Sequence, residues 1–276
     1  IEFVQAIAKA ISQVLSILEL QEQRKKLYIT LSHEITTYIT PILADAENIQ
    51  NESSTIPELS KMTSHMFGQV QRLLLMSETI LGVVSGKKTG EKFSVHSIYR
   101  PLIAAILMYK DEAEELGYKI LGPKGIGKNR FPEIEMRLFE LTLAFKNIVH
   151  NAIKYSYRPS ISQELSRFIR ITGKWLPQEK NKYCISFENY GVGITKEEID
   201  NRRIFNEFYR GYLSSDRQRT GSGIGLSYVA QVIEDMHHGK ITVQSDPQDG
   251  GAYLTTFNII LPIRQPISNR EWSKNK

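Results

Sequence analysis

A seven-residue apolar repeat over the first ninety residues constrains the fold of this 276-residue chain more than any other feature. The repeat is carried by Val4, Ile7, Ile11, Val14, Leu18, Ile35, Ile39 and Ile42, and a second register contains Leu59, Met62, Met66, Leu73, Met76, Ile80 and Val83. The pattern outlasts the roughly 25 residues of an ordinary surface helix without a capping signal, so it favours a coiled coil. The polar stretch at 51–55 predicts a helical hairpin. Burying both apolar seams then requires a second copy, in a dimeric four-helix bundle.

After a linker at Gly86–Gly90 the pattern changes to short strands mixed with helices. Helices are expected at Tyr99–Leu116, Glu135–Ser156 and Ile224–His237, and strands at Lys92–Ile98, Tyr118–Leu121, Phe168–Thr172, Tyr183–Phe187, Ile241–Ser245 and Ala252–Leu261. Thr195 and Glu198 form a capping-box pattern that opens one further short helix. The sequence therefore predicts an α+β protein, in which the helical hairpin is followed by an α/β sandwich with a mixed sheet and helices on one face.

The composition limits which binding partners and which cellular compartment are expected for this chain. The net charge of +5, from 35 basic and 30 acidic side chains, is too small and too scattered to indicate nucleic-acid binding. The single cysteine, Cys184, excludes an intrachain disulfide and fits a reducing compartment. Since no apolar run reaches the roughly 18 residues of a membrane helix, we expect a cytoplasmic fragment. The chain begins at Ile1 inside the apolar repeat, which indicates that it is a piece of a longer protein.

Three polar side chains share one face of the helix expected at Glu135–Ser156. Asn147, Asn151 and Lys154 are spaced by four and three residues. An amide oxygen can ligate Mg²⁺ and a lysine can meet a phosphate, so this face suits a metal-bound polyphosphate. The ordinary alternative is a solvated stripe on an amphipathic helix.

Two glycine clusters flank an aromatic segment. Asn189-Tyr190-Gly191-Val192-Gly193 follows an expected strand, and Gly221-Ser222-Gly223-Ile224-Gly225-Leu226 precedes an expected helix. Glycine permits close backbone approach to phosphate oxygens, but neither cluster has the spacing of a lysine-containing phosphate loop or a dinucleotide fingerprint. Between them, Ile204–Gly211 reads as an aromatic anchor and Tyr212–Thr220 as a hinged flap. Arg210, Arg217 and Arg219 could reach phosphates from this region, or belong to an ordinary surface loop.

One histidine differs from the others in its neighbours. His33 lies beside the apolar seam of the first helix and is followed directly by Glu34. A neutral imidazole is a competent nucleophile, and a carboxylate can orient it or take its proton. Taken alone, His33 would be read as a surface histidine. His65, His96, His237 and His238 have no such company and are interpreted as structural.

Taken together, these segments resemble the catalytic half of sensor histidine kinases of two-component systems. Five segments carry the resemblance in the expected order: Ser32-His33-Glu34, Asn147–Ser156, Asn189–Gly193, Phe205–Arg210 and Gly221–Leu226. The resemblance implies a signalling helix or coiled coil at 1–22, a dimerisation and histidine-phosphotransfer domain at 23–90, an ATP-binding catalytic domain at 91–265 and a basic tail at 266–276. It further implies a homodimer, an upstream sensor region outside this chain and a response-regulator receiver domain as partner.

The resemblance also implies a role for each candidate residue. His33 would be the phosphoacceptor, Glu34 its base and orienting partner, and Thr37 the residue used to dephosphorylate the regulator. With ATP and Mg²⁺ as cofactors, Asn151 would ligate the metal, while Asn147 and Lys154 would contact phosphate and Tyr155 would flank the nucleotide. The remaining nucleotide contacts implied are Asn189, Gly191, Gly193, Arg210, Gly221, Gly223, Gly225 and Leu226.

The chain departs from the family pattern at two positions. Asn189 stands where an aspartate usually accepts a hydrogen bond from the adenine amine, so ATP binding is expected to be weaker but retained, because the amide keeps an acceptor oxygen. Tyr38 replaces a proline that commonly kinks the helix. Two other functions stay open at this point: an ATPase of the wider group that uses nucleotide as a conformational clamp, and a non-catalytic dimeric scaffold with a degenerate pocket. The segment 157–167 is longer than the pattern requires.

Overall fold

The computed structural model describes residues 91–126, 131–156, 168–179, 181–215, 223–248 and 251–266, together with single residues earlier in the chain. The chain divides into two compact units, Ile1–Lys88 and Thr89–Lys276. In the first unit the described residues are all helical: Glu22, Ile35, Ile39, Ile42, Ile49, Val70, Leu73, Ser77 and Thr79. The predicted bundle, and with it His33, Glu34 and Thr37, lies outside the described residues.

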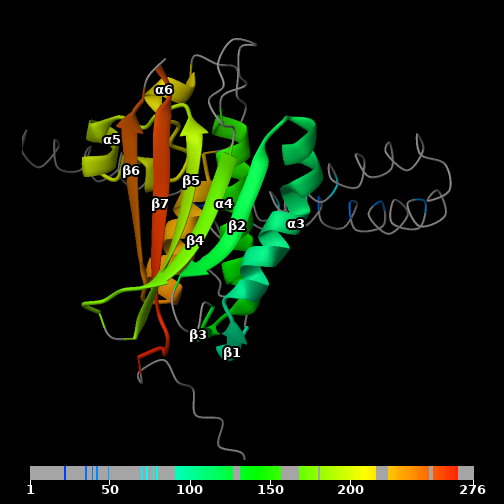
Figure 1. The fold of residues 1–276 in the computed structure, drawn as a ribbon, viewed down its shortest axis with the longest axis vertical. Helices are drawn as coiled ribbons and strands as arrows, with labels where there is room; N and C mark the ends of the chain where they lie inside the picture. The colour runs from blue at the N-terminus through cyan, green and yellow to red at the C-terminus, as the bar shows by residue number, and fades with distance from the viewer. Residues whose placement is uncertain are drawn as a thin grey trace, which may run out of the picture. The chain divides into compact units, whose positions relative to one another are not determined.

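The second unit is built on a five-stranded sheet with the strand order β2-β4-β5-β7-β6 (Figure 1). The strands are β2 (Lys119–Ile126), β4 (Phe168–Trp175), β5 (Lys182–Gly191), β6 (Lys240–Pro247) and β7 (Tyr253–Pro262). Strand β2 pairs parallel to β4, and the other neighbours are antiparallel. The mixed sheet of the sequence prediction is therefore confirmed.

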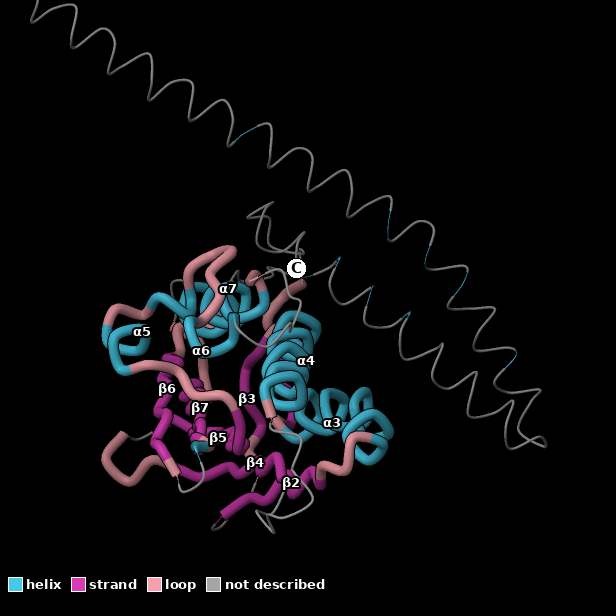
Figure 2. The backbone as a smooth tube through the Cα atoms, turned by 90° about the horizontal axis from the view of Figure 1, so that it is seen from above, coloured by secondary structure: helices cyan, strands magenta, loops and turns pink. Residues whose placement is uncertain are grey.

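Helices cover one face of this sheet. Figure 2 shows α3 (Tyr99–Glu115), α4 (Leu138–Tyr155) and α7 (Gly225–Ala230) on the same side of the strands. The apolar face of α4 contributes Leu141, Ala144, Phe145 and Ile148 to the core, and the Phe145 ring lies 5.6 Å from that of Phe187 on β5. Burial of this apolar face holds α4 in place, and leaves its other face free to carry polar groups.

The remaining elements are short. Strands β1 (Ser94–Ser97) and β3 (Glu133–Met136) form a separate antiparallel pair. Helix α5 (Lys196–Asp200) opens with the predicted capping box of Thr195 and Glu198, which is confirmed, and is followed by a 3-10 turn at Arg203–Phe205 and by α6 (Tyr212–Ser215). Among the described residues, no helix has both the length and the apolar character needed to cross a bilayer.

Two sequence expectations were wrong in detail. The helix expected from Glu135 begins only at Leu138, because Ile134 and Met136 alternate with exposed or half-buried neighbours and pair with β1 as a strand. The helix expected over Ile224–His237 is α-helical only to Ala230, and continues as a π-helix over Gln231–Met236. The widened turn ends where the backbone N–H of His237 donates to the carbonyl of Val232, five residues earlier, at 3.1 Å.

Candidate functional site

The polar face of α4 meets the start of α7. Asn147 is 8% exposed, and its side-chain nitrogen donates to the carbonyl of Leu143 at 3.0 Å. A Cβ placed on Gly225 would lie 2.9 Å from Oδ1 of Asn147 and 3.9 Å from Nδ2 of Asn151. Asn147 is therefore buried at a helix–helix contact instead of lying on a solvated stripe. Glycine at 225 is what allows this close approach.

The last turn of α4 carries the other two predicted residues of this helix. Lys154 and Tyr155 are both half-buried, and the ammonium nitrogen of Lys154 lies 5.0 Å from the centre of the Tyr155 ring. This separation is a cation–π contact. The pair lies one turn beyond Asn151, so a polar and aromatic rim continues along the helix to its end.

Gly191 joins the end of α4 to the end of β5. The N–H of Val192 donates to the carbonyl of Tyr155 at 2.9 Å, and Gly191 forms an isolated bridge with Ser156. A Cβ on Gly191 would overlap the Tyr155 carbonyl, and one on Gly193 would overlap the ring of Tyr253. Both glycines of the first cluster are thus required by close packing, and they bring that cluster directly against α4.

The orientation of the Asn189 amide follows from its partner. Asn189 is 5% exposed, and its nitrogen donates to the hydroxyl of Ser156 at 3.3 Å. That hydroxyl donates its single proton to the carbonyl of Ala152 at 2.5 Å, so toward Asn189 it can only accept. The amide nitrogen must therefore face Ser156, and the amide oxygen points away from it.

The second glycine cluster packs against the aromatic segment. Gly223 has a φ of +71°, and a Cβ there would lie 2.6 Å from the backbone carbon of Phe208 and 2.8 Å from the carbonyl oxygen of Tyr209. Leu226 lies in the first turn of α7 and is half-buried, while Arg210 is exposed. Gly221, Arg217 and Arg219 lie outside the described residues.

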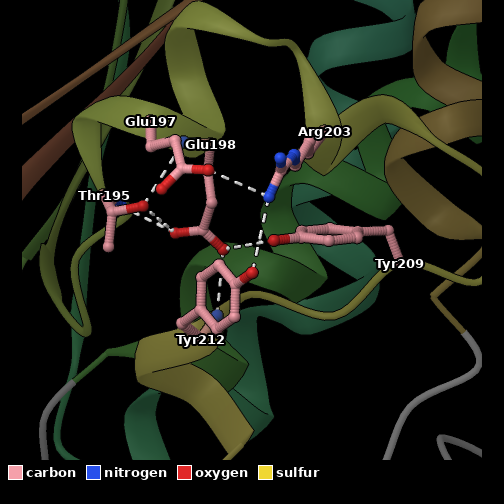
Figure 3. Close-up of polar contacts among 6 residues, drawn as sticks. All are labelled: Thr195, Glu197, Glu198, Arg203, Tyr209 and Tyr212. Carbon is pink, nitrogen blue, oxygen red and sulfur yellow. Dashed lines mark hydrogen bonds and ion pairs between the residues drawn. The ribbon is translucent and has the colours of Figure 1, made fainter.

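A fully buried carboxylate organises the aromatic segment (Figure 3). Glu198 accepts from the backbone N–H of Thr195 at 2.8 Å, the Thr195 hydroxyl at 2.6 Å, the Tyr209 hydroxyl at 3.0 Å and the backbone N–H of Tyr212 at 2.9 Å. Burial acts to raise the pKa of Glu198, but the hydrogen bonds from Thr195, Tyr212 and Tyr209 together lower it. Burial, together with the hydrogen bond to the Glu198 carboxylate, raises the pKa of Tyr209 to about 12.

Sequence reasoning found only the local half of this cluster. The capping box relates Thr195 to Glu198 over three residues, which a spacing pattern can indicate. The contacts of Glu198 with Tyr209 and Tyr212 span 11 and 14 residues across loops and left no periodic signal. Ser156, which orients Asn189, was likewise not singled out as a site residue.

A second buried polar cluster lies at the opposite end of α4. Glu140 is 1% exposed in the first helical turn, and one of its oxygens is 3.7 Å from Nη1 of Arg137. Both carboxylate oxygens of Glu91 accept from the N–H of Phe139, at 2.9 and 3.1 Å. Glu140 precedes Asn147 by seven residues, about 10 Å along a helix. The structure thus places Glu140 among Arg137 and Glu91 and not beside the asparagines, which disfavours it as the catalytic carboxylate of a clamp-type ATPase.

Comparison with known proteins agrees with this geometry. Residues 138–265 match the family described as histidine kinase-, DNA gyrase B-, and HSP90-like ATPase. The sensor protein RprX of Bacteroides fragilis (strain YCH46) is 25% identical over 261 residues, covering 89% of this chain and 44% of that protein. The sensor protein SrrB of Staphylococcus aureus (strain NCTC 8325 / PS 47) is 25% identical over 248 residues, covering 88% and 39%.

A solved structure supports the fold. The crystal structure of full-length ShkA in complex with AMPPNP matches 87% of this chain and 46% of its own, at 19% identity and a TM-score of 0.52. The chain spans less than half the length of the curated relatives described above. These findings confirm the resemblance to sensor histidine kinases, and the ATPase family match falls on residues 138–265.

Proposed function

We propose that this chain is the catalytic region of a sensor histidine kinase, which transfers the γ-phosphoryl group of ATP to His33 and then to an aspartate of a response-regulator receiver domain. The convergence of four sequence segments supports the ATP-dependent step. Asn147 and Asn151 meet Gly225, Gly191 meets Tyr155, and Gly223 meets the Phe208–Tyr209 backbone. Segments that are separate in the sequence thus meet one another, two of them directly along the C-terminal half of α4.

The chemistry of the converging groups suits a nucleotide with its magnesium ion. Asn189 and Ser156 would face the base, with the amide oxygen of Asn189 as the acceptor for the adenine amine. Asn151 would supply an amide oxygen to Mg²⁺, while Asn147 and Lys154 would contact phosphate. Over the described ranges, no three His, Cys, Asp or Glu side chains gather as a metal site. A magnesium ion that arrives on the phosphates needs only one or two protein oxygens.

The phosphoryl-transfer step requires a nucleophile from the first unit. An imidazole nitrogen of His33 would form a P–N bond as the bond from the γ-phosphorus to the ADP oxygen breaks, and Glu34 would accept the imidazole proton. Positioning and charge neutralisation carry most of such a reaction, and the amides and Lys154 would supply both, with a bound magnesium ion adding positive charge. Arg210 would add a positive charge at the phosphates.

A homodimer through the helical hairpin is part of this proposal. The seam residues Ile35 and Ile42 are 36% and 49% exposed in the single chain, although the heptad pattern gives them core positions. A second hairpin would cover them, because exposed apolar seams are removed from water in a four-helix bundle. The upstream signalling helix and the sensor region would act on this bundle.

Labelling with γ-phosphate-labelled ATP tests the proposed activity. The wild-type chain should acquire acid-labile, base-stable phosphate, and His33→Gln should lose all of it. His65→Gln, a matched change at another histidine of the hairpin, should keep the label. Turnover to ADP without protein label would indicate the conformational-clamp ATPase instead, and absence of nucleotide binding would indicate the scaffold that the Asn189 departure suggests.

The proposed phosphatase role of Thr37 has a separate test. Thr37→Ala should autophosphorylate like the wild type but remove phosphate from the regulator more slowly. Equal loss of both activities would contradict the role.

A further inference from the structure

Glu198 connects two segments that are separate along the chain, Thr195–Asp200 and Tyr209–Tyr212. Its own helix, α5, is joined through one carboxylate oxygen to Thr195, and through the other to the Tyr209 hydroxyl and the Tyr212 backbone N–H (Figure 3). The Tyr212 contact lies at the first residue of α6. Glu198 is 0% exposed, so no ligand can reach it. Its influence on any bound molecule must therefore pass through the residues that it holds.

Those residues lead to the nucleotide site by direct packing. The Phe208–Tyr209 backbone lies against Gly223, where even a Cβ would come within 2.6 Å of it. Two residues further on, Gly225 approaches Asn147 and Asn151. A shift of Tyr209 would thus displace Gly223, and through it Gly225, which meets the asparagines, because close-packed contacts transmit small displacements.

We propose that Glu198 is a positioning residue of the nucleotide site. By holding Tyr209 and Tyr212 it fixes the segment on which Gly223 rests, so nucleotide affinity depends on a carboxylate that is out of reach of the nucleotide. This inference rests on the proposed ATP-binding function. It assigns to the capping-box glutamate a role beyond starting α5, which the Thr195 contacts alone would accomplish.

The four contacts of Glu198 explain why a carboxylate is required. All four partners are donors, and an ionised carboxylate is an acceptor at both oxygens. Glutamine has the same shape but replaces one acceptor with an NH₂ donor, which would then face another donor. The neighbouring Glu197 is a matched control, since it is mostly exposed and pairs with Arg203 at 3.1 Å.

Calorimetric titration of the full chain with Mg²⁺ and AMP-PNP tests the inference. Wild type and Glu197→Gln should bind with dissociation constants within twofold of each other. Glu198→Gln should bind at least tenfold more weakly, and Tyr209→Phe, which removes one donor, about threefold more weakly. A purely structural defect would reduce the fraction of binding-competent molecules, and so the stoichiometry, while leaving the dissociation constant unchanged. A positioning role predicts instead that the dissociation constant rises while the stoichiometry stays unchanged.

Hydrogen exchange gives an independent readout. The peptides containing the Thr195 and Tyr212 amides are compared, because each amide donates to a different oxygen of Glu198 and glutamine keeps only one of these oxygens. One of the two peptides should exchange faster in Glu198→Gln, and neither should in Glu197→Gln. If Glu198→Gln folds and binds as tightly as wild type, the inference is overturned. If it does not fold, Tyr209→Phe decides, and unchanged affinity there overturns the inference. Absence of AMP-PNP binding by the wild type would instead refute the proposed function, and the inference with it.

Discussion

The second unit contains two clusters built around carboxyl groups, one around Glu198 on α5 and one around Glu91 and Glu140 at the first turn of α4. Glu198 is surrounded by donors from Thr195, Tyr209 and Tyr212, and its pKa is lowered although burial acts to raise it. Glu91, near the first turn of α4, faces Glu140. Burial and the hydrogen bond with the Glu140 side chain raise the pKa of Glu91 to about 7, although the Phe139 N–H acts to lower it. Burial alone does not decide whether a carboxyl group stays ionised, because its neighbours can reverse the effect.

The neighbours of the Glu91–Glu140 pair include the Arg137 guanidinium and the His237 imidazole. Arg137 lies 3.7 Å from Glu140, and the backbone N–H of Arg137 donates to Nε2 of His237 at 3.1 Å. Burial lowers the pKa of His237 to about 4, and its Nδ1 hydrogen-bonds the carbonyl of Val232 at 2.7 Å. The Glu198 cluster is therefore expected to keep one protonation state at neutral pH, whereas the Glu91–Glu140 cluster changes charge within the physiological range.

The largest effect is expected from removing the carboxylate of the Glu198 cluster. Glu198→Ala would leave the buried donors of Thr195, Tyr209 and Tyr212 without their acceptor, and should lower the free energy of unfolding by about 3 kcal/mol. Glu197→Ala removes an exposed charge one residue away and should cost less than about 1 kcal/mol. Urea unfolding of both variants measures the difference. Equal losses would show that the donors around Glu198 find other partners.

His237 should show the next largest effect, with a defined pH dependence. His237→Phe keeps a ring beside Phe93 but leaves the Arg137 N–H unpaired, at a cost of about 2 kcal/mol near pH 7. The unfolded imidazole ionises near pH 6.5 and the folded one only near 4, so the wild type loses stability as pH falls through this window. The variant should lack this loss. Unfolding at several pH values checks it, and identical slopes would contradict the buried neutral imidazole.

Glu91 should give the opposite pH dependence of stability, with stability lost as pH rises. Its folded pKa of about 7 exceeds the ordinary 4.5, so the folded chain holds the extra proton between these values. Stability from this group is complete below pH 4.5 and is lost as pH rises through about 7, by about 1 kcal/mol after allowance for solvent screening. Glu91→Gln should remove the decline, because an amide can donate to Glu140 at every pH. Glu133→Gln, at an exposed acid on β3, is the control for loss of one charge. A profile for Glu91→Gln that parallels the wild type would exclude the shared proton.

The smallest expected effect concerns a neutral polar residue, Asn189, of the proposed nucleotide site. Asn189→Asp would introduce the carboxylate usual in the family, with one oxygen placed where the amide oxygen of Asn189 lies. A charged acceptor exceeds a neutral one by roughly 1 kcal/mol, so AMP-PNP should bind about fivefold more tightly. Calorimetry compares this variant with wild type. Weaker binding would mean that, unlike Glu198, residue 189 lacks enough donors to keep a buried carboxylate ionised.

Much of the second unit was predictable because its signals are local. The period of Phe139–Ala152, the glycine clusters and the capping box of Thr195 each lie within a short stretch, and each predicted an element that the structure contains. The boundary near Glu135 was not predictable with the same certainty, since a four-residue strand and the first turn of a helix carry similar apolar patterns. The π-helical turn after Ala230, which ends at His237, was not predicted either.

By itself the sequence determined the α+β class, the order of the glycine and asparagine segments, and the presence of Thr195–Glu198 at a helix start. Only the tertiary structure decided that Ser156 orients Asn189, that Glu198 reaches Tyr209 and Tyr212, and that Glu91 meets the first turn of α4. The physical reason is the sequence separation over which each interaction acts. Helix periodicity and capping act over three or four residues, whereas these contacts join residues from 11 to 48 positions apart and exist only once the helices have packed on the sheet.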